Sequence, residues 1–255
     1  MLEPVEPVDV GTGAAGNDDG DAQQLPASLR QEILLEYDVA RYNFPQLVGE
    51  LLGQGGELSS LHTTPEGVDF LRGTAQTASR AYAARRNVFD KKFKQVDAFR
   101  QGSKLQETYL RFLHEVIVPA LERHVEVGNS LLYQAVPNFR CHLPGTGHLL
   151  VHRHRDADYH HQPNELNCWL PLTTTFGTNT LWAESQPGQG DFRPFELQPG
   201  QCMLFWGHQC EHYTVPNLTD HSSESLRVAS AFEPEPSSAR ALHGSRRKQR
   251  TARNP

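Results

Sequence analysis

The spacing of apolar and polar residues separates the chain into a helical first half and a strand-rich second half. Residues 27–52 predict a helix, because apolar side chains recur there roughly every three or four positions. Ser28 and Gln31 have the spacing of a capping box near its start. Residues 53–77 contain several glycines and predict a loop, whereas residues 78–101 predict a second, basic helix.

A third helix is predicted to begin at Ser103, which has capping-box spacing to Gln106. Its apolar positions follow at three- and four-residue intervals: Leu105, Tyr109, Phe112, Leu113, Val116 and Leu121. Pro119 should kink or end this helix, because proline lacks the backbone N–H and crowds the preceding turn. We expect residues 27–128 to form a helical layer that covers one face of a sheet.

From Asn129 onward, short apolar segments alternate with clusters of glycine, proline and asparagine, a pattern typical of strands and turns. The predicted strands are Leu131–Val136, His148–His152, Glu165–Leu172, Asn179–Trp182, Phe192–Leu197, Gln201–Trp206, His212–Val215 and Leu226–Phe232. About eight strands at this spacing indicate a sandwich or barrel, and a double-sheet jelly roll fits the count. The predicted fold class is α+β with a mainly β core, a double-stranded β-helix (jelly roll) over residues 129–235.

Composition changes the picture at both ends of the chain. Residues 1–26 hold six acidic residues and no basic one, and the stretch from Arg240 to Arg253 holds five arginines and one lysine. Neither end shows apolar periodicity, so residues 1–26 and 236–255 are predicted to be disordered tails. Alternatively, the basic run Arg246–Arg250 is a nuclear localisation signal or a contact for an anionic partner.

The formal net charge of -6 argues against a nucleic-acid partner. The first residues lack the basic and apolar regions of a signal peptide, and no long apolar run predicts a membrane span. The four cysteines show no CxxC pairing: Cys141, Cys168, Cys202 and Cys210. We therefore expect free thiols in a reducing compartment and a cytoplasmic protein. The sequence does not indicate an oligomeric state.

His154, Asp156 and the distant His212 are the candidate metal ligands. Residues at positions i and i+2 of a strand point to the same face, so His154 and Asp156 can aim together from the end of a strand that begins near His148. His212 follows another predicted strand and can return beside them. Two imidazoles and one carboxylate are the ligand set of non-haem iron(II) oxygenases, which leaves one face of the metal open.

Two other interpretations compete with this one. The chain has 13 histidines, so a His-x-Asp pair can arise by chance and form a surface ion pair. His208, Cys210 and His212 also alternate, and they could supply half of a zinc site.

Between Tyr133 and Phe232 the chain carries an ordered series of longer motifs. They begin with Tyr133-Gln134, Pro137-Asn138-Phe139-Arg140 and His154-Arg155-Asp156-Ala157-Asp158-Tyr159. They continue with the stretches Glu165–Thr173, Thr178–Ser185, Cys210–Thr219 and Leu226–Val228. This series resembles the 2-oxoglutarate- and iron(II)-dependent dioxygenase superfamily, and within it the StrG-type proteins named after streptomycin biosynthesis.

The resemblance implies roles for individual residues. His154, Asp156 and His212 would bind iron(II), and Arg227 would bind the distal carboxylate of 2-oxoglutarate, with O2 as the other substrate. A guanidinium matches a carboxylate through two parallel hydrogen bonds. The family pattern has a shorter interval from the last histidine to the arginine and a serine two positions after it. Here Ala229 stands at that position, so Ser230 or another group would have to supply the hydroxyl.

Three further polar residues are candidates near the metal. Asn167 either faces the cavity as a cofactor contact or makes a hydrogen bond at a sheet edge. Arg140 and Gln134 are candidates for contact with a polar substrate. The resemblance implies an oxidoreductase that hydroxylates a small polar metabolite. The alternative is a cupin-like metal-binding jelly roll without oxygenase activity, either an isomerase or epimerase or a non-catalytic binding protein.

Overall fold

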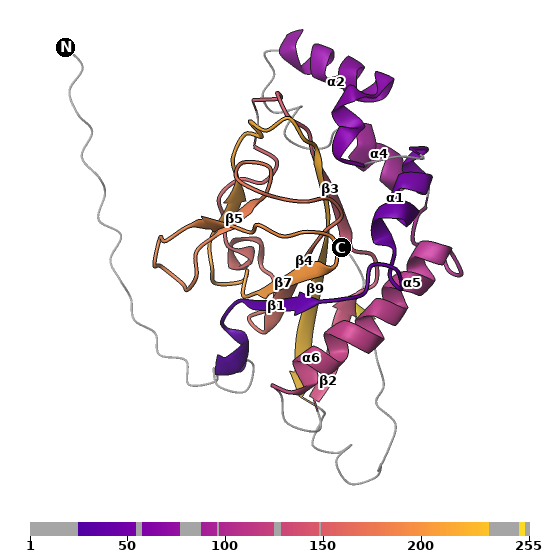
Figure 1. The fold of residues 1–255 in the computed structure, drawn as a ribbon. Coiled ribbons are helices and arrows are strands. Elements are labelled where there is room, and N and C mark those ends of the chain that lie inside the picture. The colour runs from indigo at the N-terminus through magenta and orange to yellow at the C-terminus, as the bar shows by residue number, and fades with distance from the viewer. Residues whose placement is uncertain are drawn as a thin grey trace, which may run out of the picture.

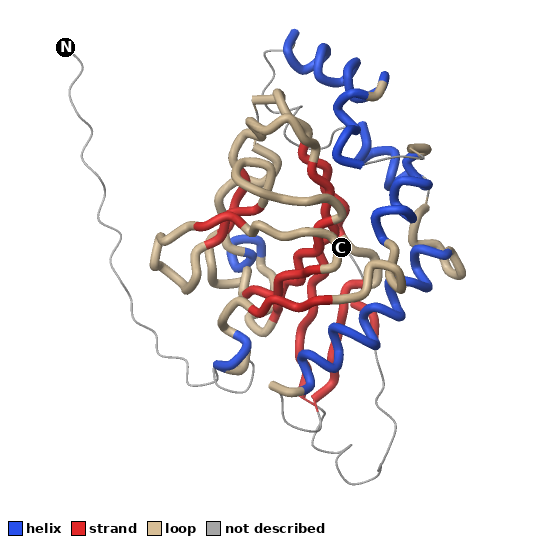
Figure 2. The backbone as a smooth tube through the Cα atoms, in the orientation of Figure 1, coloured by secondary structure: helices blue, strands red, loops and turns tan. Residues whose placement is uncertain are grey.

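The computed structural model describes residues 25–54, 58–76, 88–95, 97–124, 129–147, 149–234 and 250–252. Two sheets and a layer of helices make up the fold, and Figures 1 and 2 show the helices gathered along one side of the large sheet. The α+β class predicted from the sequence is confirmed. The predicted acidic tail lies almost entirely outside the described residues.

The large sheet has seven strands in the order β1-β7-β4-β9-β2-β10, and β3 pairs separately with β9. Its strands are β1 (Ile33–Glu36), β2 (Asn129–Gln134), β3 (Asn138–His142), β4 (Glu165–Pro171), β7 (Gln201–Phe205), β9 (Ser223–Pro234) and β10 (Arg250–Ala252). All pairings in it are antiparallel except that of β10 with β2. A second sheet has the order β6-β5-β8, with β5 (Leu181–Ala183), β6 (Arg193–Pro194) and β8 (His212–Thr214).

The segment predicted as one helix over residues 27–52 is the main error of the sequence interpretation. Ile33–Glu36 is strand β1, which lies at the edge of the large sheet and pairs with β7, and its side chains alternate between half-buried and exposed. Only Phe44–Leu52 forms a helix, α1, capped by the Asn43 side chain. Ala27–Leu29 is a short 3-10 turn with no side-chain cap, so the predicted capping box at Ser28 is wrong. The apolar run in this segment is too short to distinguish the period of a helix from that of a strand. A helix was therefore predicted where a strand forms.

The predicted loop over residues 53–77 is also wrong. It contains a 3-10 turn, Leu58–Thr63, and helix α2, Pro65–Gln76. Proline is favoured in the first turn of a helix, where its missing N–H costs nothing. Gly67 does not break this helix; a Cβ there would lie 2.1 Å from the Leu61 carbonyl oxygen, so glycine permits the close approach of the two elements.

The remaining helices agree better with the sequence. Helix α4 spans Val88–Gln95 within the predicted basic helix, whose residues 78–87 lie outside the described part. Helix α5, Lys104–Phe112, begins at Ser103, whose side chain accepts the Gln106 N–H at 3.2 Å, as predicted. Pro119 does not end the helical path. A π-helical turn, Leu113–Ile117, precedes it, and α6 continues over Val118–Glu122, which lets the path pass a residue that cannot donate a backbone hydrogen bond.

One core joins the helices to the large sheet, and it contains Phe44, Phe112, Leu166, Leu226 and Val228. A smaller core lies between the two sheets, where Trp169 and Phe205 of the large sheet pack with Leu181 and Phe195. The fold therefore has three layers: helices, large sheet and small sheet. The four cysteines are all described, are buried and form no disulfide, in agreement with the sequence. No helix in the described ranges is long and apolar enough to cross a bilayer.

Two strand predictions need correction. No strand forms over residues 149–153 of the predicted strand His148–His152. The chain meets the small sheet there through a bridge between His154 and His212 and through hydrogen bonds of Leu150 and Val151 with Thr214 of β8. Strand β3, Asn138–His142, was missed. Arg250–Ala252, inside the predicted basic tail, forms β10, so the expected lack of regular structure does not hold for these three residues.

Glu224 on β9 is the most deeply buried carboxyl group of the large sheet. It is completely buried on the helical side, where the Cys141 thiol donates to its Oε1 at 3.2 Å and its Oε2 has no hydrogen-bond partner among the described residues. Burial raises the pKa of Glu224 to about 8, the nearby Asp90 charge adds to the rise, and the Cys141 hydrogen bond opposes it.

We predict that Glu224→Gln changes the pH dependence of stability. Between the ordinary pKa of 4.5 and about 8, the folded protein keeps a proton that the unfolded chain has lost. Wild-type stability should therefore fall as pH rises through this window, by on the order of a few kcal/mol, whereas the neutral glutamine has no proton to lose. Urea unfolding at several pH values, with exposed Glu36→Gln as the control, measures the effect. Parallel curves for wild type and Glu224→Gln would contradict it.

Candidate metal centre

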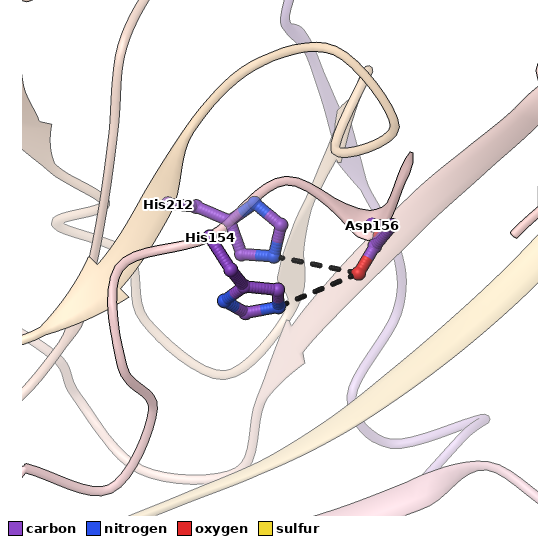
Figure 3. A group of neighbouring side chains, drawn as sticks. All are labelled: His154, Asp156 and His212. Atoms are coloured by element: carbon purple, nitrogen blue, oxygen red, sulfur yellow. Dashed lines mark ion pairs between the residues drawn. The ribbon is translucent and has the colours of Figure 1, made fainter. Parts of the chain in front are cut away.

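Three side chains from two distant parts of the chain converge between the two sheets. The Nε2 atoms of His154 and His212 lie 3.6 Å and 3.7 Å from Oδ1 of Asp156, and Figure 3 shows both rings directed at this one oxygen. These separations exceed a good hydrogen bond. They fit donors that share one central ion through bonds of about 2 Å each. The side chains of Asp156 and His212 are 4% exposed and that of His154 is 15% exposed.

The backbone that carries these ligands differs from the predicted strand. His154 and His212 exchange both backbone hydrogen bonds, at 3.2 Å and 2.9 Å, which fixes the two residues side by side. Asp156 begins a 3-10 turn, Asp156–Tyr159, and its N–H donates to the Gly207 carbonyl at 2.9 Å. The prediction that the side chains of His154 and Asp156 point to the same place is correct. The cause is the β-bridge at His154 and the 3-10 turn that begins at Asp156, and not the alternation of side chains along one strand.

Hydrogen bonds to carbonyl groups fix the orientation of both imidazoles. The Nδ1 of His154 lies 2.6 Å from the His152 carbonyl oxygen, and the Nδ1 of His212 lies 3.0 Å from that of Cys210. A carbonyl only accepts, so each Nδ1 must carry the proton. Each Nε2 then presents its lone pair to the centre, which is the arrangement found in metal-binding histidines.

The pKa values of the three groups reflect burial and mutual attraction. Burial lowers the pKa of His212 to about 4, and Asp156 only partly offsets it. Burial also opposes protonation of His154, but the Asp156 carboxylate and the His152 carbonyl outweigh it and raise the His154 pKa. Burial would raise the pKa of Asp156, yet His154, Arg227 and His212 hold it well below the usual range. Asp156 is therefore a carboxylate, the form that binds a cation.

The second oxygen of Asp156 is held from the opposite side. The Asn167 amide N–H donates to Oδ2, and the Arg227 guanidinium donates to the same atom at 3.2 Å. Arg227 also donates to the Asn167 side-chain oxygen at 3.0 Å, which closes a three-residue ring. With Oδ2 occupied in this way, Oδ1 is the oxygen left to face the imidazoles.

Gly207 leaves the space in which this ring forms. A Cβ at this position would lie 2.2 Å from Asn167 Nδ2 and 3.0 Å from Asp156 Oδ2. In the sequence, Gly207 directly follows the predicted strand Gln201–Trp206 and lies five residues before the candidate ligand His212. A glycine at this place was the available signal for a close approach of the backbone to the site.

A cavity of about 360 Å³ opens onto the three ligands. Its lining includes Arg140 and Arg227, as expected for residues that contact a substrate or co-substrate. Asn167 lies on the cavity side of β4 but is 1% exposed and is not part of the lining, so it orients Asp156 and Arg227 and does not contact a ligand directly. Trp169, on the same face of β4, completes the floor of the cavity.

Two predicted residues are not brought to the cavity. Ser230 lies on the face of β9 that carries Leu226 and Val228, toward the helices, because it is an odd number of residues from Arg227. The Oε1 atom of Gln134 accepts the Ala229 N–H at 3.3 Å, and Gln134 does not line the cavity. The hydroxyl on the Arg227 face is Ser225, which lines the cavity and belongs to β9, one residue before the predicted start of this strand at Leu226.

The zinc interpretation is not supported by the geometry. Among the described residues, two groups of three potential ligands converge: His154 with Asp156 and His212, and Asp156 with His161 and Glu165. Neither contains His208 or Cys210. The second group was missed; its His161 Nδ1 lies 2.7 Å from Glu165 Oε1, so these two side chains already form a hydrogen-bonded pair.

Comparison with known proteins gives a sequence relative over most of the chain. No family model matches the chain. It is 26% identical over 204 residues to the streptomycin biosynthesis protein StrG of Streptomyces griseus, a match that covers 78% of this chain and 86% of StrG. This match agrees with the resemblance noted in the sequence motifs.

Similar solved structures include a nickel complex of the non-heme monooxygenase ThoJ, 16% identical, with a TM-score of 0.41 over 81% of this chain and 77% of that chain. Another is EvdO2 from Micromonospora carbonacea var. aurantiaca complexed with 2-oxoglutarate, 18% identical, with a TM-score of 0.39 over 57% of this chain and 69% of that chain. Both TM-scores are too low to indicate a shared fold.

We predict that Gly207→Ala weakens metal binding without unfolding the protein. The added methyl group must displace Asn167 from Asp156 Oδ2, and loss of a partner that orients a metal ligand typically costs roughly 10- to 100-fold in affinity. Anaerobic titration with Fe(II) measures the change. Gly73→Ala, where a Cβ meets nothing within 4 Å, is the matched control. Equal affinities in the two variants would show that the Gly207 approach is not needed.

Proposed function

We propose that this protein is a non-haem iron(II)- and 2-oxoglutarate-dependent oxygenase with a double-stranded β-helix core, and that it hydroxylates a small polar metabolite. The observation that carries the proposal is the convergence of His154, Asp156 and His212 on one point at the wall of a cavity. Two imidazoles and one carboxylate select iron(II) in oxygenases of this kind. The match to StrG, a streptomycin biosynthesis protein, supports a role in making or modifying a small metabolite.

Each group around the metal has a distinct task in this proposal. His154, Asp156 and His212 hold the metal from one side and leave the cavity side open. Asn167 fixes the Asp156 carboxylate, and the low exposure of the ligands excludes bulk water. When bound, iron(II) and 2-oxoglutarate supply the oxidising chemistry, and the protein supplies binding and orientation.

Arg227 is the proposed anchor for the distal carboxylate of 2-oxoglutarate. Its guanidinium lines the cavity, and its described hydrogen bonds, to Asp156 and Asn167, both use Nη1. The other guanidinium N–H groups can therefore pair with a carboxylate while Nη1 keeps its contacts.

A metal-binding protein without oxygenase activity is the second candidate, and one observation favours it. Arg227 already neutralises Asp156 at 3.2 Å, so the charge of this pair is balanced before any co-substrate arrives. In this case the cavity would hold a metal ion and a ligand other than 2-oxoglutarate. Binding of 2-oxoglutarate is therefore the property that separates the two candidates.

We predict that the protein binds Fe(II) and then 2-oxoglutarate under anaerobic conditions, with a weak visible charge-transfer absorption. Replacing His154 or His212 with alanine should lower Fe(II) affinity by more than about 100-fold, because removal of a ligand costs more than removal of its hydrogen-bond partner. His160→Asn, an exposed position with φ of 62° that asparagine tolerates, is the control histidine variant. Full iron affinity in His154→Ala would disprove the ligand assignment.

We further predict that Arg227→Gln retains Fe(II) but loses 2-oxoglutarate. A hydrogen-bonded ion pair with a guanidinium contributes about 1.5–3 kcal/mol, so affinity for 2-oxoglutarate should fall roughly 10- to 100-fold. Fe(II) affinity should hold or rise, because the variant removes a positive charge next to Asp156. Calorimetric titration of each ligand separates the two effects. If wild-type protein binds Fe(II) but no 2-oxoglutarate, the second candidate replaces the oxygenase.

A further inference from the structure

The charged side chains that line the cavity at the metal centre already have partners. Arg227 donates to Asp156, and Asp90 and Arg140 each have contacts of their own with the protein. A substrate that carries a charge would have to compete with these contacts. The groups that recognise the substrate are therefore better sought among the other polar side chains of the lining.

Apart from the metal ligands, those other polar side chains carry imidazole, hydroxyl or indole groups: His152, Tyr159, His161, Trp169 and Ser225. Within the described ranges, the hydrogen bond that involves one of these polar groups is the contact of His161 with Glu165. Hydroxyl groups and a neutral imidazole each offer both a donor and an acceptor. A hydroxyl group on a ligand also does both, so it can pair with any of them.

Two of these groups are held in place by the large sheet. The Nδ1 of His161 lies 2.7 Å from Oε1 of Glu165 at the start of β4, and the Glu165 side chain is largely buried. This contact fixes the ring, so Nε2 is the ring nitrogen that remains for a ligand. Ser225 lies on β9, two residues before Arg227, and therefore shares its face of the sheet.

Tyr159 adds an exposed aromatic ring beside the metal ligands. It is 62% exposed, although it lines the cavity, and its ring lies 5.1 Å from that of His154 at an angle of 75°. Tyr159 ends the 3-10 turn that begins at Asp156, and the Asp158 carboxylate stabilises this turn by accepting the Arg155 N–H at 2.9 Å. A ligand that packs on Tyr159 is therefore placed next to the metal centre.

We propose that the primary substrate is a neutral ring with several hydroxyl groups, a sugar or a cyclitol, that packs on Tyr159 and hydrogen-bonds to His161 and Ser225. The C–H groups on the face of such a ring suit an aromatic side chain, and the hydroxyl groups at its edge donate and accept. The cavity of about 360 Å³ is at the small end of the range for ligand pockets, which favours a single ring over a chain of several.

This inference rests on the proposed function for the reaction, but ring binding itself uses none of the three metal ligands. The experiment is a ligand-observed NMR titration of the full chain with methyl β-D-glucopyranoside and with myo-inositol. It is run without added metal and again with 2-oxoglutarate and Zn(II), which replaces Fe(II) because it does not broaden the signals. Sorbitol has the hydroxyl groups without the ring, and D-glucuronate and D-glucosamine each add one charge to the ring.

We expect at least one of the two neutral rings to bind more tightly than sorbitol and both charged sugars. Tyr159→Ala should weaken its binding about tenfold or more, whereas Tyr159→Phe should keep most of it because the ring remains. His161→Gln keeps a donor for Glu165 but removes Nε2, and it should weaken binding about fivefold, as should Ser225→Ala. Phe176→Ala removes an exposed aromatic ring outside this cavity and should change nothing.

The proposal would be overturned if neither neutral ring bound in either form of the protein, or if sorbitol or a charged sugar bound as tightly. Unchanged affinity in Tyr159→Ala, or an equal loss in Phe176→Ala, would place the ring elsewhere and would also overturn it. Ring binding that persists when the Fe(II) and 2-oxoglutarate titration fails would count against the oxygenase alone. Circular dichroism checks the fold of each variant, and Ser225→Ala, which only removes a hydroxyl, tests the cavity independently of the turn.

Discussion

The division of the Asp156 carboxylate between two sets of partners is the constraint on which the site depends. Oδ1 faces two imidazole nitrogens at 3.6 Å and 3.7 Å, whereas Oδ2 is held by Asn167 and Arg227. A carboxylate that is 3% exposed would be strongly unfavourable without such partners. The same contacts that make its burial tolerable also orient it, so the stability of the folded site and its ability to hold a metal have one cause.

The three layers of the fold explain how these partners stay in place. Asn167 and Arg227 lie on neighbouring strands β4 and β9, whose other faces pack in the core shared with the helices. His154 and His212 belong to the opposite side of the cavity and are joined to one another by two backbone hydrogen bonds. The carboxylate therefore lies between two surfaces that are each fixed independently. A shift of either surface would separate the imidazoles from Oδ1 or the guanidinium from Oδ2.

Sequence patterns predicted the site better than the elements that carry it. The side chains of His154, Asp156, His212, Asn167 and Arg227 do lie together. They could be singled out because the resemblance depends on the identity and order of residues and not on the exact backbone. Strand β1 could not be predicted in this way, because Ile33–Glu36 forms a strand only by pairing with β7, which is far away in the sequence. Ser230 was misplaced because the resemblance called for a hydroxyl near Arg227, although the two residues are three positions apart in one strand and therefore point to opposite faces.

The two faces of the large sheet also explain why two buried carboxyl groups, Glu224 and Asp156, have pKa shifts in opposite directions. Glu224 faces the helices, where no cation compensates it among the described residues, and its pKa is raised to about 8. Asp156 lies on the other side of the sheet, where Arg227 and two imidazoles keep it ionised. Asp90 stands at the edge of β3 between these two environments, with one oxygen on the Cys141 N–H and the cavity beside it. Helix α4 therefore contributes a buried carboxylate to the lining of the cavity in addition to the apolar side chains that it packs into the core.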